Sequence, residues 1–231
     1  MANRLTLDVE RVRQNLATVR ERIASACARA GRDPGEVELL AATKYVPVDQ
    51  LGVLAEAGIV LLGENIAGDL VEKHDRWGER FTFDFIGHLQ SRKTKLVLPR
   101  VRLIHSVESE SVLRQLERHA PAEARALLEV NLAREASKQG VDPDAVDSFI
   151  ERADSFGRVH FAGLMTMPPL VSDPEQARPY FTALRELGRR LGERWRPRHE
   201  FAVLSMGTSQ DFEVAVEEGA TVVRLGSVLY A

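Results

Sequence analysis

The feature that most constrains the fold of this chain is a unit of one short apolar strand followed by one amphipathic helix, which repeats eight times in 231 residues. Each predicted strand is a short run rich in Val, Leu, Ile, Phe and Ala, which is typical of parallel strands buried on both faces. The predicted strands cover 37–42, 59–62, 81–86, 101–105, 126–130, 159–164, 201–204 and 221–225.

The segments between the strands carry apolar residues three or four positions apart, the spacing of one helix face. An additional helix over 6–30 precedes the first strand and ends at Gly31; we interpret it as a packing helix. The other predicted helices cover 47–58, 66–77, 91–98, 109–119, 143–156, 174–194 and 209–217.

Eight strand and helix units predict a single-domain α/β protein over residues 1–231, a (β/α)8 TIM barrel, whose usual size is about 250 residues. Since little sequence follows the eighth strand, we expect the 6–30 helix to fill the place of a short last helix. A doubly wound open sheet would use the same elements but usually needs a glycine-rich turn after its first strand. Here that strand leads into Thr43-Lys44-Tyr45-Val46-Pro47, which lacks glycine, so the barrel is favoured.

Composition excludes several classes of protein. Hydrophobic residues make up 44% and charged residues 28%, as in ordinary globular domains. No window approaches the ~18 apolar residues of a membrane span, and residues 1–5 lead into a helix without a signal-peptide segment. The net charge of −3, the single Cys27 and six histidines without ligand spacing argue against a nucleic-acid partner, a disulfide and a metal site. We therefore expect a cytoplasmic protein without a membrane partner, and a monomer.

In a TIM barrel the carboxyl ends of the strands form the functional face. Small and hydroxyl residues follow the last two strands at this face: Ser205, Gly207, Thr208, Ser209, Gly226 and Ser227. Their amides and hydroxyls could bind a phosphate, which this fold usually holds after strands seven and eight. The alternative is that Thr208 or Ser209 merely caps a helix with Asp211 in its first turn, and that Gly226 makes a turn.

Lys44 ends the first strand at the same face. We expect the barrel mouth to shield it from water, which would favour the neutral, nucleophilic amine that forms a Schiff base. The alternative is a solvated lysine on a loop. A lysine beside a phosphate site suits pyridoxal 5′-phosphate (PLP), which has both an aldehyde and a phosphate, although aldolases with the barrel fold share this logic.

Short motifs along nearly the whole chain resemble those of the pyridoxal phosphate homeostasis protein family, single-domain barrels similar to the N-terminal domain of alanine racemase. The motifs are Ala42-Thr43-Lys44, Gly63-Glu64-Asn65, the stretch 85–91 (Phe-Ile-Gly-His-Leu-Gln-Ser), His105-Ser106-Val107, Gly163-Leu164-Met165, Ser205-Met206-Gly207 and Arg224-Leu225-Gly226. The chain departs from the family pattern at Ile66, Arg92 and Thr208.

The resemblance implies that Lys44 carries PLP as an internal aldimine and that Arg224 faces the pyridine nitrogen. It also implies that Ser205, Gly226 and Ser227 hold the phosphate. Asn65 and Met165 would form walls of the cofactor site. The implied function is a PLP-binding carrier or buffer in PLP homeostasis, with apo-forms of PLP enzymes as possible recipients.

Two arguments favour a carrier without catalytic turnover over an amino-acid racemase. Arginine only donates hydrogen bonds, so Arg224 would leave the pyridine nitrogen unprotonated and the ring a poor electron sink. Racemisation also needs a second base, which in alanine racemase is a tyrosine of another domain, and Tyr45, Tyr180 and Tyr230 are no obvious substitutes. A racemase and a Schiff-base aldolase remain the alternatives.

Other polar residues have two interpretations each. Arg92, Lys93 and Lys95, with Arg100 and Arg102 nearby, could attract an anionic cofactor or an acidic partner, or could form a solvated helix face. His88 could bond across the mouth or orient its own loop. We expect His105 to be a core histidine with its hydrogen bonds satisfied.

Overall fold

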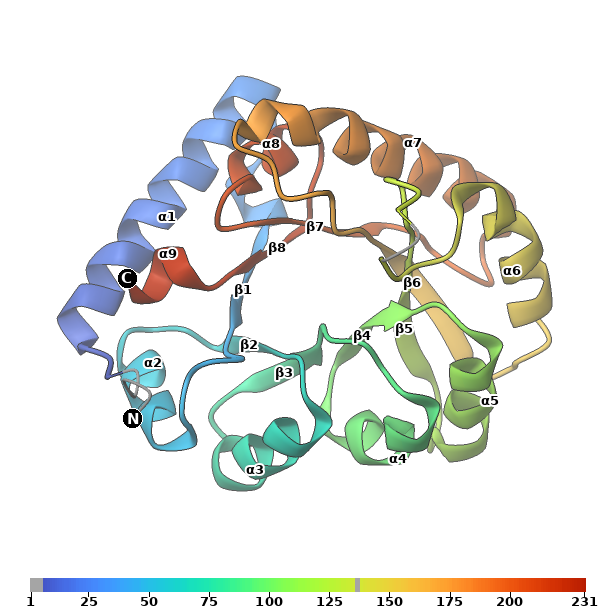
Figure 1. The fold of residues 1–231 in the computed structure, drawn as a ribbon, viewed down its shortest axis with the longest axis horizontal. Helices are drawn as coiled ribbons and strands as arrows, with labels where there is room; N and C mark the ends of the chain where they lie inside the picture. The colour runs from blue at the N-terminus through green and yellow to red at the C-terminus, as the bar shows by residue number, and fades with distance from the viewer. Residues whose placement is uncertain (1–5, 136–137) are drawn as a thin grey trace.

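The computed structural model describes residues 6–135 and 138–231, and its centre is a closed barrel of eight parallel strands in the order of the sequence (Figure 1). The first strand pairs with the last, with Leu40 opposite Arg224. The barrel predicted from the strand and helix repeat is therefore confirmed. The strands are β1 (Glu38–Ala42), β2 (Leu61–Glu64), β3 (Thr82–Phe85), β4 (Leu103–Val107), β5 (Ala124–Glu129), β6 (Val159–Met165), β7 (Val203–Thr208) and β8 (Val222–Leu225).

Helices form a ring outside the strands, as Figure 1 shows. Short 3₁₀ turns precede or follow several of them, such as Ser91–Lys93 and Leu98–Arg100 around α4. The α-helices are α1 (Val9–Ala30), α2 (Leu51–Glu56), α3 (Ala67–Trp77), α4 (Thr94–Val97), α5 (Glu110–His119), α6 (Val146–Ala153), α7 (Arg178–Trp195), α8 (Phe212–Glu217) and α9 (Ser227–Tyr230).

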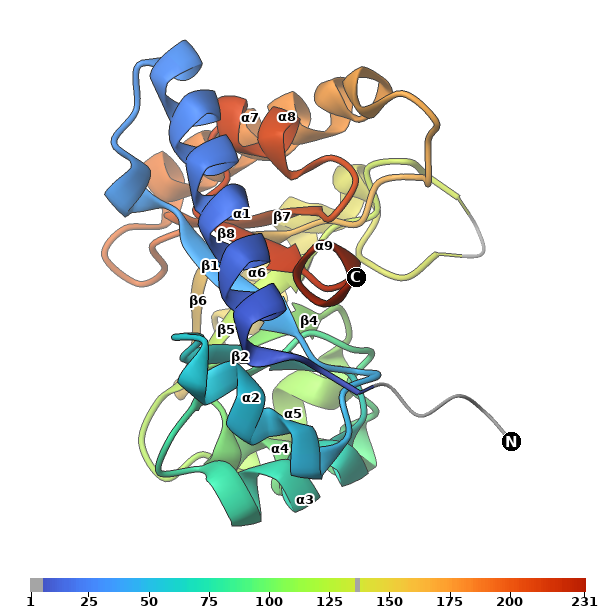
Figure 2. The ribbon, with the colours of Figure 1, turned by 90° about the vertical axis from the view of Figure 1, so that its left-hand side faces the viewer.

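Helix α1 packs where the first and last strands meet (Figure 2). The side chain of Asp8 caps its first turn by accepting from the amide of Arg11, and Gly31 ends it in the left-handed conformation. The amide of Asn15 donates to the carbonyl oxygens of Leu229 and Ala231 at distances of 3.2 and 3.0 Å. The four-residue α9 is thus the short last helix that the sequence predicted, and α1 lies against it.

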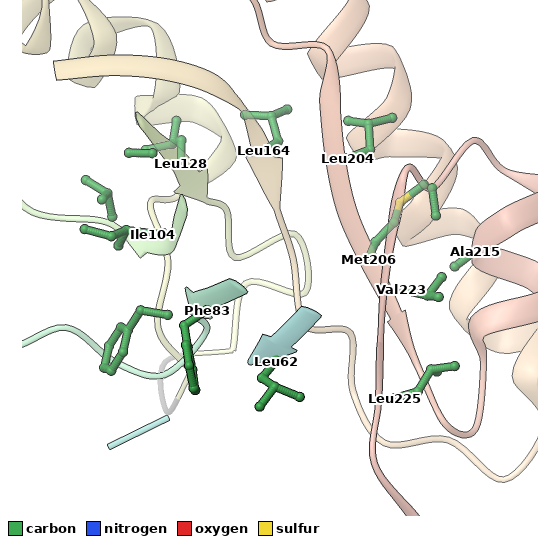
Figure 3. Close-up of a cluster of buried hydrophobic side chains, with 14 of the residues drawn as sticks. Leu62, Phe83, Ile104, Leu128, Leu164, Leu204, Met206, Ala215, Val223 and Leu225 are labelled. Atoms are coloured by element: carbon green, nitrogen blue, oxygen red, sulfur yellow. The ribbon is translucent and has the colours of Figure 1, made fainter. Parts of the chain in front are cut away.

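The main hydrophobic core lies between the outer face of the barrel and the helices. Figure 3 shows one side chain after another from neighbouring strands in this layer: Leu62, Phe83, Ile104, Leu128, Leu164, Leu204 and Val223. Alternate residues of each strand point into the barrel instead. The interior is tightly filled, because a Cβ on Gly63 would lie only 2.2 Å from Cδ2 of Leu40.

All eight strands differ from their predicted ranges by one or more residues, and β2 and β7 show the reasons. Strand β2 starts at Leu61 rather than at residue 59, because Val60 is exposed and the pairing with β3 starts with Leu61 opposite Thr82. Strand β7 starts at Val203 and runs on to Thr208, where it pairs with Arg224 of β8. Both strands therefore carry polar residues further into the sheet than the apolar runs indicated.

Within 6–135 and 138–231, no helix is long and apolar enough to cross a membrane. The same part of the chain contains no cluster of three His, Cys, Asp or Glu side chains that could hold a metal ion. Residues 1–5, which the signal-peptide argument used, lie outside the described residues.

Candidate functional site

A cavity of about 580 Å³ opens at the carboxyl ends of the strands. Six of the eight predicted site residues line it: Lys44, Asn65, Met165, Arg224, Gly226 and Ser227. An adjoining cavity of about 730 Å³ shares four lining residues with it: Glu129, Gln139, Met167 and Thr208. The structure therefore brings together, in one mouth, residues from opposite ends of the sequence.

Lys44 follows β1 in a turn and is exposed, so the expectation that the mouth shields it from water is wrong. Its Nζ lies 4.8 Å from the ring centroid of Tyr45, at cation–π distance. Lys44 has no hydrogen bond or ion pair to another described residue, which leaves its amine accessible from the cavity.

The backbone next to Lys44 is anchored by a buried ion pair. Nζ of Lys73, on α3, lies 2.5 Å from Oε1 of Glu64 and donates to the carbonyl of Thr43 at 2.7 Å. The hydroxyl of Thr43 donates to the same Oε1. In the sequence analysis Glu64 was only part of a motif and Lys73 had no assigned role. The two residues are nine positions apart, which is not the spacing of neighbours on a helix face, so the sequence did not reveal this pair.

Arg224 reaches the cavity from β8 and is almost completely buried. Its Nη1 donates to the carbonyl and hydroxyl oxygens of Ser205, at 2.8 and 2.5 Å, and its Nη2 donates to the carbonyl of Thr166 at 2.9 Å. Burial lowers the pKa of Arg224 to about 10, against the opposing effects of Glu129 and Asp211. The guanidinium is therefore still charged at neutral pH.

The other two predicted site residues lie beneath the cavity surface. Ser205 is fully buried, and its hydroxyl contacts Arg224 and Nδ1 of His105. Gly207 has φ +91°, and a Cβ there would lie 2.6 Å from Cβ of Ala215. Neither residue lines the cavity, and their placement suits a structural support for the site.

Ser209, one of the hydroxyl residues of the predicted phosphate site, links the loops after β7 and β8. Its Oγ accepts hydrogen bonds from the amides of Gly226 and Val228, at 3.1 and 3.4 Å. Asp211 accepts from the amide of Thr208 and is the N-cap residue of α8, so it lies before the helix rather than in its first turn. The loops after β7 and β8 thus join around one hydroxyl and two backbone amides.

Glu129, at the end of β5, is a titratable group that the sequence analysis missed. It lines both cavities, and its side chain has no hydrogen bond or ion pair to another described residue. Burial raises its pKa to about 7, with a further contribution from Glu108 and opposition from Arg224. A carboxyl group near the carboxyl end of the otherwise apolar run 126–130 was the available signal.

His88 and the basic residues after it separate into different environments. Nδ1 of His88 lies 3.0 Å from Oε1 of Glu108, so His88 reaches the loop after β4 rather than only its own loop. Arg102 is bound to Glu38 and Asp84 at the other end of the barrel. Arg92, Lys93 and Lys95 are exposed, and Arg92 donates to the side chain of Gln90.

Comparison with known proteins relates the chain to a family of cofactor-binding barrels. The family described as "Alanine racemase, N-terminal domain" matches residues 7–231. The pyridoxal phosphate homeostasis protein of Aquifex aeolicus is 37% identical over 225 residues, which cover 94% of this chain and 96% of that protein. The protein of the same name from Escherichia coli is 30% identical and covers 95% of each chain.

Solved structures agree with these matches. A structure described as an unknown protein from Bifidobacterium adolescentis has a TM-score of 0.88 and 32% identity, over 99% of both chains. PipY of Synechococcus elongatus, solved with PLP bound, has a TM-score of 0.82 and 27% identity, over 95% of this chain and 100% of PipY. Alanine racemase of Clostridium difficile is 14% identical with a TM-score of 0.70 over 57% of its length, a similarity of fold alone.

Proposed function

Because this chain belongs to the alanine racemase N-terminal domain family, we propose that it binds PLP in the barrel mouth and acts in PLP homeostasis, as a carrier or buffer of the cofactor. The observation that carries the proposal is that Lys44, Arg224 and the Gly226–Ser227 turn line one cavity. An amine, a charged donor and backbone amides match the aldehyde, the ring nitrogen and the phosphate of PLP. A volume of about 580 Å³ is in the usual range for a small-molecule site.

In this proposal Lys44 forms the covalent bond to PLP. Its Nζ condenses with the aldehyde carbon of PLP, which forms a C=N bond and releases water. The accessible amine of Lys44 supports this role, since it lines the cavity without a carboxylate partner among the described residues. Thr43, Glu64 and Lys73 fix the backbone from which this side chain extends.

In this proposal the turn after β8 and Ser209 bind the phosphate of PLP, rather than Ser205. The amides of Gly226 and Val228 donate to Oγ of Ser209, which leaves the proton of that hydroxyl free to be donated to an anion at this turn. Asn65 and Met165 line the cavity as walls, and Gly207 supports the loop from below.

We propose further that the protein is a cytoplasmic monomer, formed by one domain over residues 1–231, that passes PLP to apo-forms of PLP enzymes. A charged Arg224 keeps a ring nitrogen unprotonated, which disfavours carbanion chemistry. This combination favours storage and transfer over turnover.

A racemase activity is the second candidate, because Tyr230 lines the same cavity as Lys44. Burial and the neighbouring Glu64 both raise the pKa of Tyr230, which makes its hydroxyl a poor base near neutral pH. We therefore expect no exchange of solvent deuterium into Cα of a panel of amino acids by the PLP-loaded protein. Rapid exchange that Tyr230→Phe abolishes would establish the racemase instead.

The test of cofactor attachment is borohydride reduction of the PLP-loaded protein followed by peptide mapping. The chain has only five lysines, 44, 73, 93, 95 and 138, so a single labelled peptide identifies the site. We expect the label on Lys44, its loss in Lys44→Ala, and its retention in Lys95→Ala, which removes an exposed lysine of α4. Protein that acquires no visible absorbance with PLP would overturn the proposal.

The phosphate assignment has its own test, the ratio of affinities for PLP and for pyridoxal, which lacks the phosphate. Ser209→Ala should weaken PLP binding about tenfold, the order of one charge-assisted hydrogen bond, and leave pyridoxal binding nearly unchanged. Ser148→Ala, an exposed serine on α6, is the matched control. Equal losses for both ligands would place the phosphate elsewhere.

A further inference from the structure

A column of buried polar side chains crosses the interior of the barrel. Asp84, His105, Ser205 and Arg224 come from β3, β4, β7 and β8, and each has an exposed fraction of 5% or less. Two small apolar clusters share the interior with the column; one contains Leu103, Leu127, Ala162 and Met165, and the other Leu40, Leu61 and Val222. Polar groups in such a place are costly unless every one is hydrogen-bonded, so the connections of the column are informative.

The connections are continuous. Nη1 of Arg224 lies 2.5 Å from Oγ of Ser205, and that hydroxyl lies 2.9 Å from Nδ1 of His105. Nε2 of His105 lies 3.2 Å from Oδ2 of Asp84. Each pair is within hydrogen-bond distance. The guanidinium can only donate, the carboxylate can only accept, and the hydroxyl and the imidazole can do either.

The arginine fixes the direction of the whole column. A guanidinium can only donate, so Oγ of Ser205 accepts from Arg224, and with a neutral His105 beside an ionised Asp84 the proton of Ser205 is donated to Nδ1. Nδ1 is then the acceptor nitrogen of a neutral imidazole, and the proton on Nε2 is donated to the carboxylate of Asp84. The alternatives need a charged imidazole or a protonated Asp84, and both are disfavoured because the pKa of His105 and the pKa of Asp84 are lowered.

The far end of the column is closed by a second arginine. Arg102 donates from Nε and Nη2 to the two oxygens of Asp84, at 3.1 and 2.8 Å, and also binds Glu38. Burial alone would raise the pKa of Asp84, but the hydrogen bonds from His105 and Arg102 outweigh it and the net pKa is lowered. Burial lowers the pKa of His105. Both directions agree with a carboxylate beside a neutral histidine.

Building on the proposed function, we propose that Asp84, His105 and Ser205 are positioning residues that hold Arg224 as a fixed, charged donor toward the ring nitrogen of the cofactor. Nη1 is held by Ser205, while Nη2 contacts the carbonyl of Thr166 and, at 2.8 Å, Sδ of Met167. A thioether is a weak acceptor, and Met167 is half-exposed at the cavity. Nη2 is therefore the donor that a ring nitrogen takes over when it replaces Met167.

The first test needs no cofactor, and it uses a variant of the column only to assign a signal. In the cofactor-free protein with ¹⁵N-labelled histidine, His105 should be neutral from pH 6 to 8, with its proton on Nε2 and a bare Nδ1. The signal is assigned by its absence in His105→Gln. A proton on Nδ1, or a charged imidazole in this range, would overturn the column.

The second test separates positioning from mere support of the fold, using PLP and its analogue in which carbon replaces the ring nitrogen. Ser205→Ala should lower the affinity for PLP about tenfold, the order of one hydrogen bond, and change the affinity for the analogue little. Ser205→Thr, which keeps the hydroxyl, should restore the wild-type preference for PLP.

The outcomes of these tests are distinct. An equal loss for PLP and the analogue in Ser205→Ala would show that Ser205 only supports the barrel, and would overturn the proposal. Wild-type protein that binds neither ligand would refute the proposed function instead. In that case the position of the proton on His105 still decides whether the column holds Arg224.

Discussion

The buried pair of Glu64 and Lys73 gives a sharp test of how the cofactor end of the barrel is stabilised. The change to make is Lys73→Met, which keeps the length of the side chain and removes its charge. Glu64 is fully buried and Lys73 is 5% exposed at its side chain. After the substitution, the carboxylate of Glu64 keeps the hydroxyl of Thr43 and loses its only cationic partner among the described residues.

The magnitude follows from this burial. Removal of one partner from a buried ion pair costs about 3–5 kcal/mol, because the remaining charge is left without compensation in a medium of low polarity. The free energy of unfolding should therefore fall by about that amount in Lys73→Met. Adding Glu64→Gln neutralises the orphaned carboxylate, keeps an acceptor for Thr43, and should recover about 2 kcal/mol.

The assay is urea denaturation of the four proteins of the cycle, followed by circular dichroism at one pH. Arg189→Met is the control, since Arg189 pairs with Glu193 on the exposed face of α7, where both side chains are about two-thirds exposed. It should leave the midpoint unchanged. Losses of stability in Lys73→Met and Glu64→Gln that simply add in the double variant would refute the reasoning.

Three further predictions concern other parts of the molecule. The pKa of Glu129 is about 7 in the folded state against 4.5 when unfolded, so the free energy of unfolding should fall by about 3 kcal/mol as the pH rises between these values. Glu129→Gln should remove this fall, and parallel plots of unfolding free energy against pH for the two proteins would contradict the prediction. Gly207→Ala should lower the free energy of unfolding by about 1–3 kcal/mol, because Gly207 has a φ of +91° and a Cβ there would lie 2.6 Å from Cβ of Ala215. Gly68→Ala on α3, where a Cβ meets nothing within 4 Å, should raise it by about 0.5–1 kcal/mol; equal effects of the two variants on thermal unfolding would contradict this argument. Cys27 is fully buried in α1, so a thiol reagent should label it only at the rate of unfolding, and labelling that is fast in native buffer would show that α1 detaches on its own.

The fold could be predicted because its signals are local. Each strand is an apolar run and each helix an apolar stripe, so their order along the chain already implied the barrel. Helix α1 was predicted over 6–30 with its end at Gly31, and it starts at Val9. The boundaries of β2 were less accessible, because pairing with β3 rather than hydrophobicity decides where that strand starts.

The site was only partly predictable because its contacts are not local. Lys44 and Arg224 could be placed at the same mouth from the topology of a barrel alone. The hydrogen bond between His105 and Ser205 joins residues 100 positions apart, and no spacing rule reveals it. The exposure of Lys44 was mispredicted because it depends on the direction of a turn after β1, which the sequence of Thr43-Lys44-Tyr45 does not determine.

The pairing of β1 with β8 also sets an order of events during synthesis of the chain. Arg224, the partner residue of Leu40, is synthesised 184 residues after it. Until then one edge of β1 has no neighbour, and the nascent barrel cannot close. Because Arg224 and the Gly226 turn arrive together with that closing strand, the pocket is completed at the same moment as the fold. A polypeptide that has not finished folding would then have no mouth in which to retain a reactive aldehyde.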